Sequence, residues 1–241
     1  MKKIKYIVVV VCCLGFVELG YAQGEKTKEL LNKVTTSYEN KKQYQIAVTY
    51  NMHRGFTGNT ITESYNGKMI RNDDFTQFKL ASSEILRFSQ SQLSIDHDEK
   101  KIIYSQNNKN GNVQNSPLDI NGFLEYYDQT KITEKNDVLI CEMVSTKTNF
   151  QNPYGKVVMY INKNSYQIEK QELFFSTLIP FAESDNNAKK MDYGRLVILL
   201  NHEDLKNKAK PNLGDYIDVS SKNKMSLKEQ YQGYTLINQA N

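Results

Sequence analysis

Apolar residues near the start of the chain recur at helical spacing. From Glu25 to Tyr38 the apolar positions are Leu30, Leu31, Val34 and Tyr38, and lysines and glutamates fill the other face. Steps of three and four residues place these side chains on one stripe of an α-helix. The pattern therefore predicts an amphipathic helix that buries one side.

The hydrophobic period then changes from 3.6 to 2. Five apolar residues alternate with mostly polar ones, namely Tyr44, Ile46, Val48, Tyr50 and Met52. Strict alternation is typical of an antiparallel strand with one covered and one wet face. Gly55 and Gly58 mark the turn after it, and Asn66-Gly67 predicts a second hairpin turn because both residue types tolerate positive φ.

Short extended segments dominate the remainder of the chain. They are predicted at 61–65, 68–72, 75–80, 84–90, 92–95, 101–106, 138–147, 156–161, 166–175, 196–201, 216–219 and 233–237. A second helix is predicted from Pro117 to Asp128, with Ser116 as its N-cap and with Phe123, Leu124, Tyr126 and Tyr127 as an aromatic side. This order predicts an α+β architecture, in which one antiparallel sheet curves around a small helical layer.

The first 22 residues have the layout of a secretory signal peptide. Lys2, Lys3 and Lys5 precede an uncharged apolar run, and small residues end the segment at Ala22. Glu18 interrupts the run after roughly a dozen residues, whereas a membrane-spanning helix needs about 20. A lipidated N-terminus is disfavoured because the two cysteines of this segment follow four valines. We therefore predict an exported, periplasmic protein cleaved after Ala22.

Charge and cysteine content narrow the classes of function. Removing residues 1–22 takes away three lysines and one glutamate, so the net charge falls from +4 to +2. This near balance gives no support to nucleic-acid binding, which usually requires a concentrated basic surface. Cys141 is then the single cysteine, so no internal disulfide is possible, and its apolar neighbours indicate a buried side chain.

The sequence shows no constellation typical of catalysis. His97 and His202 stand in acidic segments, but neither matches a known metal-ligand spacing, and we expect polar turns or strand ends. No phosphate-binding glycine loop and no nucleophile elbow is present. The carboxylate pairs Asp73-Asp74 and Glu125/Asp128 are of a kind common on solvated surfaces. We predict a non-enzymatic protein without metal or cofactor.

The order of elements resembles that of the outer-membrane lipoprotein carrier LolA and its relatives, including RseB/MucB-type sensor domains. The resemblance covers roughly Glu25 to Asn201. It rests on the exported leader and on five segments: Glu29-Leu30-Leu31-Asn32-Lys33-Val34, Tyr44 to Met52, Ser64-Tyr65-Asn66-Gly67-Lys68-Met69, the pair Leu93-Ser94-Ile95-Asp96 and Lys101-Ile102-Ile103-Tyr104, and Gly155 to Phe175. Asp96-His97-Asp98-Glu99 replaces the family's frequent Asp-Gly-Lys turn, and the chain has no tryptophan.

The resemblance implies an incomplete β-barrel with helices covering its concave side over an apolar cavity. A cavity of this type holds the acyl chains of a lipoprotein or another lipid in transit, because each methylene kept from water contributes about 0.8 kcal/mol. The apolar positions that could line it are Tyr44, Ile46, Val48, Tyr50, Met52, Phe123, Tyr127, Val157, Met159, Ile161, Leu173 and Phe175. From periodicity alone, the same residues would fill an ordinary core.

Two functional hypotheses follow. The first is a periplasmic carrier of lipid or lipoprotein acyl chains, with transient contact to a membrane surface. The alternative is an envelope sensor or adaptor of the RseB-like type that binds a protein partner, with Tyr231 and Tyr234 of the tail 220–241 as a docking element. We expect a half-barrel domain over residues 23–205 and a C-terminal extension, residues 206–241, packed on the same domain.

Overall fold

The computed structural model of the chain describes residues 24–106, 124–146, 152–183, 189–205, 209–219 and 225–239. The predicted signal peptide and Phe123 lie outside these residues, as does most of the predicted second helix. That helix is described only at its end: Leu124 is helical, and a turn follows at residues 125 and 126. The predicted continuation of the helix to Asp128 is therefore wrong.

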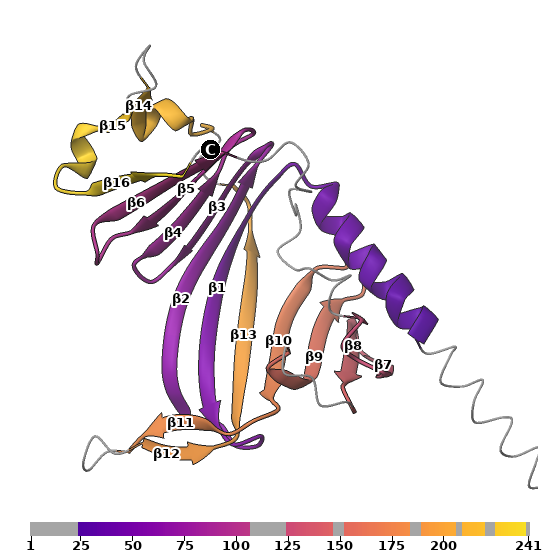
Figure 1. Cartoon of the computed structure of the whole chain (residues 1–241). Coiled ribbons are helices and arrows are strands. Elements are labelled where there is room, and N and C mark those ends of the chain that lie inside the picture. The colour runs from indigo at the N-terminus through magenta and orange to yellow at the C-terminus, as the bar shows by residue number, and fades with distance from the viewer. Residues whose placement is uncertain are drawn as a thin grey trace, which may run out of the picture. The chain divides into compact units, whose positions relative to one another are not determined.

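The described residues contain one long helix, residues 24–39, and sixteen strands (Figure 1). The strands are β1 Gln43–Arg54, β2 Ile61–Asn72, β3 Phe75–Leu80, β4 Ser83–Arg87, β5 Ser91–Asp96, β6 Lys101–Gln106, β7 Gln129–Lys135, β8 Val138–Val144, β9 Tyr154–Asn162, β10 Ile168–Phe175, β11 Ile179–Ala182, β12 Lys189–Asp192, β13 Gly194–Glu203, β14 Ile217–Val219, β15 Met225–Leu227 and β16 Thr235–Asn238. Two short 3₁₀ turns, Leu213–Asp215 and Glu229–Tyr231, complete the described elements.

Twelve strands form one sheet in the order β16-β6-β5-β4-β3-β2-β1-β13-β10-β9-β8-β7. The neighbours from β2 to β6 and from β7 to β10 pair antiparallel, whereas β16 joins β6 in parallel. The order ends at β16 and β7, so the sheet is not closed into a barrel. The predicted α+β class with an open, mainly antiparallel sheet is confirmed.

The chain divides into two compact units, and each is described by itself. Unit 1 comprises Met1–Asn40, Asn51–Glu63 and Gln114–Leu199; unit 2 comprises Lys41–Tyr50, Ser64–Val113 and Leu200–Asn241. The predicted division between residues 205 and 206 follows the sequence instead and stays a prediction.

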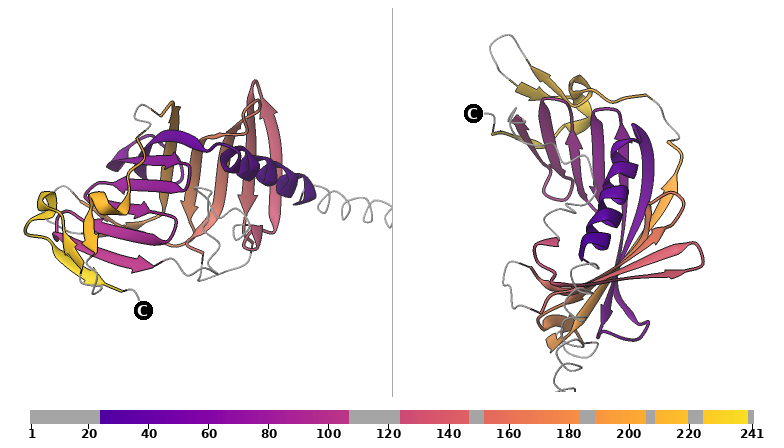
Figure 2. Two further views of the ribbon diagram at one scale, coloured as in Figure 1. Left: turned by 90° about the horizontal axis from the view of Figure 1, so that it is seen from above. Right: turned by 90° about the vertical axis from the view of Figure 1, so that its right-hand side faces the viewer.

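The helix packs on the sheet of unit 1 through its predicted apolar stripe. Leu31 and Val34 are fully buried, and Tyr38 is 1% exposed. The Ile168 N–H donates a hydrogen bond to the Tyr38 hydroxyl at 3.1 Å, and the Ser37 hydroxyl donates to the Tyr166 carbonyl at 3.2 Å. Figure 2 shows the helix beside strands β7–β10. Side-chain stripe and backbone contacts together fix this helix on the strands.

Unit 2 has its own core on one face of strands β3–β6. Phe75, Leu86, Leu93 and Ile102 are at most 1% exposed, and Ile217 of the C-terminal extension packs into the same cluster. Seven further apolar or aromatic residues of the extension cover it: Leu213, Tyr216, Met225, Leu227, Tyr231, Tyr234 and Leu236. The extension therefore completes this core.

Gly67 does not form the predicted hairpin turn. Strand β2 runs straight through Asn66-Gly67, and the chain turns instead at Asp73, where φ is +58°. Gly67 is required for a different reason: a Cβ there would lie 2.9 Å from the Lys79 carbonyl oxygen and 3.5 Å from the Tyr50 ring. Asn-Gly is a sequence typical of hairpin turns, but at this position the close approach of neighbouring groups explains the glycine.

Candidate functional site

Four of the predicted cavity residues lie on one face of unit 2. Tyr44, Ile46 and Val48 of β1 are at most 6% exposed, and Tyr50 is half-buried. They alternate along one strand, so they share a side of the sheet. The Tyr50 ring lies against the position where Gly67 would carry its Cβ, which identifies this side on β2 as well. We call it the apolar face of unit 2.

A row of apolar side chains crosses this face in register. Met69 of β2 is opposite Phe78 of β3, which is opposite Ile85 of β4. The row continues through Ser94 and Ile103 to Ile237 of β16. All six residues are half-buried, so the row is neither a closed core nor a wetted surface. We call these six residues, five apolar ones and Ser94, the apolar row.

The apolar row spans a length suited to an extended hydrocarbon chain. It crosses six strands, and five spacings of about 4.8 Å give about 24 Å. One leaflet of a bilayer, half of a hydrocarbon core of about 30 Å, is about 15 Å deep. The row is therefore longer than one leaflet is deep.

Basic side chains flank the apolar row on one side. The next register row of the same face carries Arg71, Thr76, Arg87, Gln92 and Ser105. The Arg87 Nε donates to the Gln92 side-chain oxygen at 2.9 Å, which holds the guanidinium beside the row. This flank offers charged donors for an acidic head group next to an apolar track.

Burial governs the tyrosines of this face. It raises the pKa of the Tyr44 phenol above its usual value near 10, while the neighbouring Arg71 acts in the opposite direction. Burial also raises the pKa of Tyr50. Both phenols therefore stay neutral at physiological pH and present apolar ring surface with a polar edge.

The predicted residues of unit 1 occupy a closed core. Val157, Met159 and Ile161 of β9 are 0% exposed, and Leu173 of β10 is 6% exposed. In register with them on β8 are Met143 and Cys141, which are also fully buried. This is the core that the helix at residues 24–39 seals with Leu31, Val34 and Tyr38.

Aromatic residues gather where β9 begins and β10 ends. The rings of Tyr154 and Phe175 meet edge to face at 5.0 Å, and the Tyr127 hydroxyl donates to the Tyr154 carbonyl at 3.3 Å. Tyr127 is 5% exposed, whereas Phe175 and the predicted Met52 of β1 are half-buried. Burial raises the pKa of both Tyr127 and Tyr154. Tyr127 and Phe175 are distant in sequence, but both contact Tyr154 and therefore belong to one cluster.

Cys141 is a structural thiol. It is 0% exposed, and burial raises its pKa to about 12, with the Thr27 hydroxyl acting in the opposite direction. A thiol in this environment is protonated at neutral pH and unreactive. The expectation of a buried hydrophobe at this position is confirmed.

Searches for other kinds of site add two findings, both limited to the described residues. There, no three His, Cys, Asp or Glu side chains gather in a way that could hold a metal ion. In the same part of the chain, no helix combines the length and apolar character needed to cross a membrane.

The sequence interpretation missed the residues of the apolar row. Each belongs to a predicted or observed short strand, and the alternation within β3 and β4 was visible. What could not be read was the register, since the row exists only when Met69, Phe78 and Ile85 are placed opposite one another. The misplaced turn at Asn66-Gly67 alone would have moved β2 out of this register.

The class that this geometry defines is an open, mainly antiparallel sheet with one docked helix and an apolar face. The chain matches no family model and no curated protein sequence. Among solved structures, it is similar to a putative outer membrane lipoprotein-sorting protein domain from Vibrio parahaemolyticus, with 11% identity, coverage of 80% of this chain and 96% of that chain, and a TM-score of 0.36.

Two further structures have similar folds. A LolA superfamily protein from Nitrosomonas europaea shares 14% identity over 75% of this chain and 94% of its own, with a TM-score of 0.32. A chain of the MucA/MucB complex of Pseudomonas aeruginosa shares 12% identity over 79% of this chain and 60% of its own, with a TM-score of 0.40. The predicted resemblance in the order of elements is thus found again among structures, and at this level it says nothing of a ligand or a residue's role.

Proposed function

We propose that the protein is an exported, non-enzymatic carrier that binds acyl chains, of a lipoprotein or another lipid, on the apolar face of unit 2. The observation that supports this most directly is the apolar row, which joins six strands in register yet stays half-exposed. In an ordinary core, other elements cover such a row completely, as the C-terminal extension covers the opposite face of the same strands. A half-open row suits cargo that must be taken up and released.

The row supplies enough apolar contact for useful affinity. Ten methylenes transferred from water contribute about 8 kcal/mol, which corresponds to a Kd of about 1 µM. This strength holds a cargo during transit between two membranes without making release too slow. The proposal therefore places the protein in the periplasm, as the signal peptide predicts, with brief membrane contact at loading and delivery.

Titration with a fluorescent fatty acid tests the site. The Phe78→Asp variant places a charge in the middle of the row, and we expect at least a tenfold loss of affinity. Phe78→Leu keeps an apolar side chain and should stay within threefold of the parent. Leu199→Asp is the matched control, because Leu199 is an apolar residue of unit 1 that is 42% exposed. Equal affinity of Phe78→Asp and parent protein would remove the row from the site.

The basic flank gives the proposal an orientation. An acidic head group beside Arg71 and Arg87 would form charge-assisted hydrogen bonds, whereas a neutral head group would not. Arg87→Gln is therefore expected to weaken binding of a probe with a free carboxylate about fivefold and to leave its neutral amide analogue unchanged. Equal losses for the two probes would argue against a head group at this flank.

The predicted cavity residues of unit 1, including Val157, Met159 and Ile161, are a separate proposal within that unit. They reach a ligand only when the helix at residues 24–39 lifts from the strands. Hydrogen exchange of the helix amides, measured with and without saturating fatty acid, separates the possibilities. Faster exchange on binding supports a lid that opens for cargo; unchanged exchange assigns these residues to the core alone.

A further inference from the structure

A groove on the other face of unit 2 combines carboxylates with tyrosine rings. It is an open depression of about 520 Å³ that is lined by Glu84, His97, Asp215, Tyr216, Gln230, Tyr231 and Tyr234. Strand β4 contributes Glu84, the turn after β5 contributes His97, and the C-terminal extension contributes the other five. We call it the tyrosine groove.

The three rings of the groove are held in a fixed relative arrangement. Tyr216 and Tyr231 stack at 6.1 Å with an interplanar angle of 24°, and Tyr234 meets Tyr231 edge to face at 5.4 Å and 80°. Tyr216 is in turn packed on Phe88, at 5.9 Å. The rings therefore form a preformed corner, and its arrangement does not depend on a ligand.

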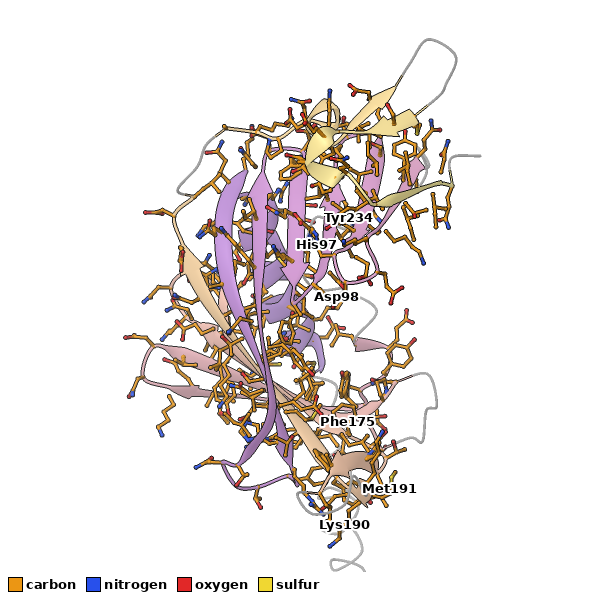
Figure 3. All side chains as sticks on the ribbon, turned by 90° about the vertical axis from the view of Figure 1, so that its left-hand side faces the viewer. His97, Asp98, Phe175, Lys190, Met191 and Tyr234 are labelled. Carbon is orange, nitrogen blue, oxygen red and sulfur yellow. The ribbon has the colours of Figure 1, made fainter. Side chains whose placement is uncertain are left out.

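Glu84 is the nearly buried carboxylate of the groove, and hydrogen bonds hold it in place. It is 8% exposed, and its carboxylate accepts hydrogen bonds from the Gln77 amide at 2.5 Å and from His97 Nε2 at 3.2 Å. His97 Nδ1 then pairs with the Tyr234 hydroxyl at 2.9 Å, which joins sheet and extension (Figure 3). A nearly buried carboxylate favours a positive charge nearby.

The negative charge of Glu84 acts on the tyrosines that line the groove. Burial is the main cause that raises the pKa of Tyr231, to about 12, and the charge of Glu84 adds to it. The pKa of Tyr216 is raised in the same way, by burial first and then by Glu84 and Asp215. The lining residues include no lysine or arginine; the nearby Lys228 is already paired with Asp218 at 2.5 Å, and the exposed Lys79 is the cross-strand neighbour of Glu84.

From these observations we propose that the tyrosine groove binds an alkylammonium group. Ring faces attract cations, most strongly when the cation is poorly hydrated and a carboxylate is close. A quaternary ammonium group is such a poorly hydrated cation, and Glu84 is the nearby carboxylate. The chemistry is shared by a free quaternary ammonium compound such as choline and by the head group of a choline lipid. This site lies on the face of the strands opposite the apolar row, so the two proposals stand or fall separately.

Calorimetric titration of the intact mature chain tests the groove. Choline is expected to bind saturably, whereas 3,3-dimethylbutan-1-ol, its uncharged isostere, should bind at least tenfold more weakly. Glycerophosphocholine identifies the source: tighter binding than choline indicates a lipid head group, and equal or weaker binding indicates a free quaternary ammonium compound. No saturable binding of choline or glycerophosphocholine, or equal binding of the uncharged isostere, would overturn the proposal.

Variants separate recognition from folding. Glu84→Gln should lower choline affinity at least tenfold, and Tyr231→Leu at least threefold, whereas Tyr231→Phe keeps the ring and should stay within twofold. Phe56→Leu, which removes an exposed ring of unit 1, is the control, and circular dichroism confirms that each variant is folded. Unchanged choline affinity in folded Glu84→Gln contradicts the proposal. Phe78→Asp should lose fatty acid and keep choline, which distinguishes the two sites.

Discussion

The ring of Tyr50 lies against Gly67, with its Cε2 atom 3.5 Å from the position that a Cβ on residue 67 would take. The same Cβ would lie 2.9 Å from the Lys79 carbonyl oxygen on the neighbouring strand. Residue 67 is therefore a glycine because two neighbours, one of them backbone, fill its side-chain space. This packing fixes where β1 and β3 meet β2.

We predict that Gly67→Ala destabilises the protein. Overpacking against backbone costs about 1–3 kcal/mol, and the smaller gain from replacing a strand glycine offsets about 0.5–1 kcal/mol. Urea denaturation should show a net loss of about 1 kcal/mol. Gly24→Ala is the control, because nothing lies within 4 Å of its Cβ. Equal stability of the two variants would contradict the packing described.

Removing one hydroxyl should loosen the helix of unit 1. Tyr38→Phe keeps the buried ring but leaves the buried Ile168 N–H without its acceptor. An unsatisfied buried donor costs about 1–3 kcal/mol, which urea denaturation measures. Tyr193→Phe, at a ring 43% exposed, should change stability by less than about 0.5 kcal/mol. If Tyr38→Phe leaves the stability unchanged, this hydrogen bond does not hold the helix.

His53 gives unit 1 a pH-dependent stability. Burial, with Arg195 nearby, lowers its pKa below the usual value near 6.5, so the unfolded chain binds a proton more readily than the folded one. The contribution is complete above about pH 6.5 and is lost as the pH falls through the folded value. We expect the His53 ring to titrate below 6.5 by NMR, and the unfolding free energy to fall between pH 7 and 5 by less in His53→Gln. A midpoint above 6.5 would contradict this.

The Cys141 thiol should resist alkylation in the folded protein. Its burial and its pKa of about 12 leave almost no thiolate at pH 8. Iodoacetamide is expected to label it only after unfolding in urea. Ser89→Cys, at an exposed position, provides the reactive control and should be labelled within minutes. Rapid labelling of native Cys141 would mean that the core under the helix opens readily.

The sequence predicted those features that depend on neighbours along the chain. The helical stripe of Leu31, Val34 and Tyr38 and the alternation from Tyr44 to Tyr50 both gave the correct element and the correct buried side. Strand β7 was missed because it is mostly polar and exposed, with Ile132 as its single large apolar residue. Strands β11, β12 and β15 were missed because each has only three or four residues.

The parts that could not be predicted depend on register and on long-range contacts. The apolar row needs six strands in one alignment, and β16 joins β6 from more than a hundred residues away. Tyr231 and Tyr234 were proposed as a docking element, but they pack on the core of unit 2. Deleting residues 220–241 would therefore expose that core, and single substitutions such as Tyr231→Phe are the better probes of this segment.

Photo-crosslinking with a fatty acid that carries a diazirine in mid-chain tests the central proposal most directly. After irradiation and proteolysis, mass spectrometry locates the attached chain. The proposal predicts labelling, competed by unlabelled palmitate, in peptides that contain Met69, Phe78 or Ile85. Labelling confined to other segments, or no competable labelling in these peptides, would contradict an acyl-chain site on the apolar row.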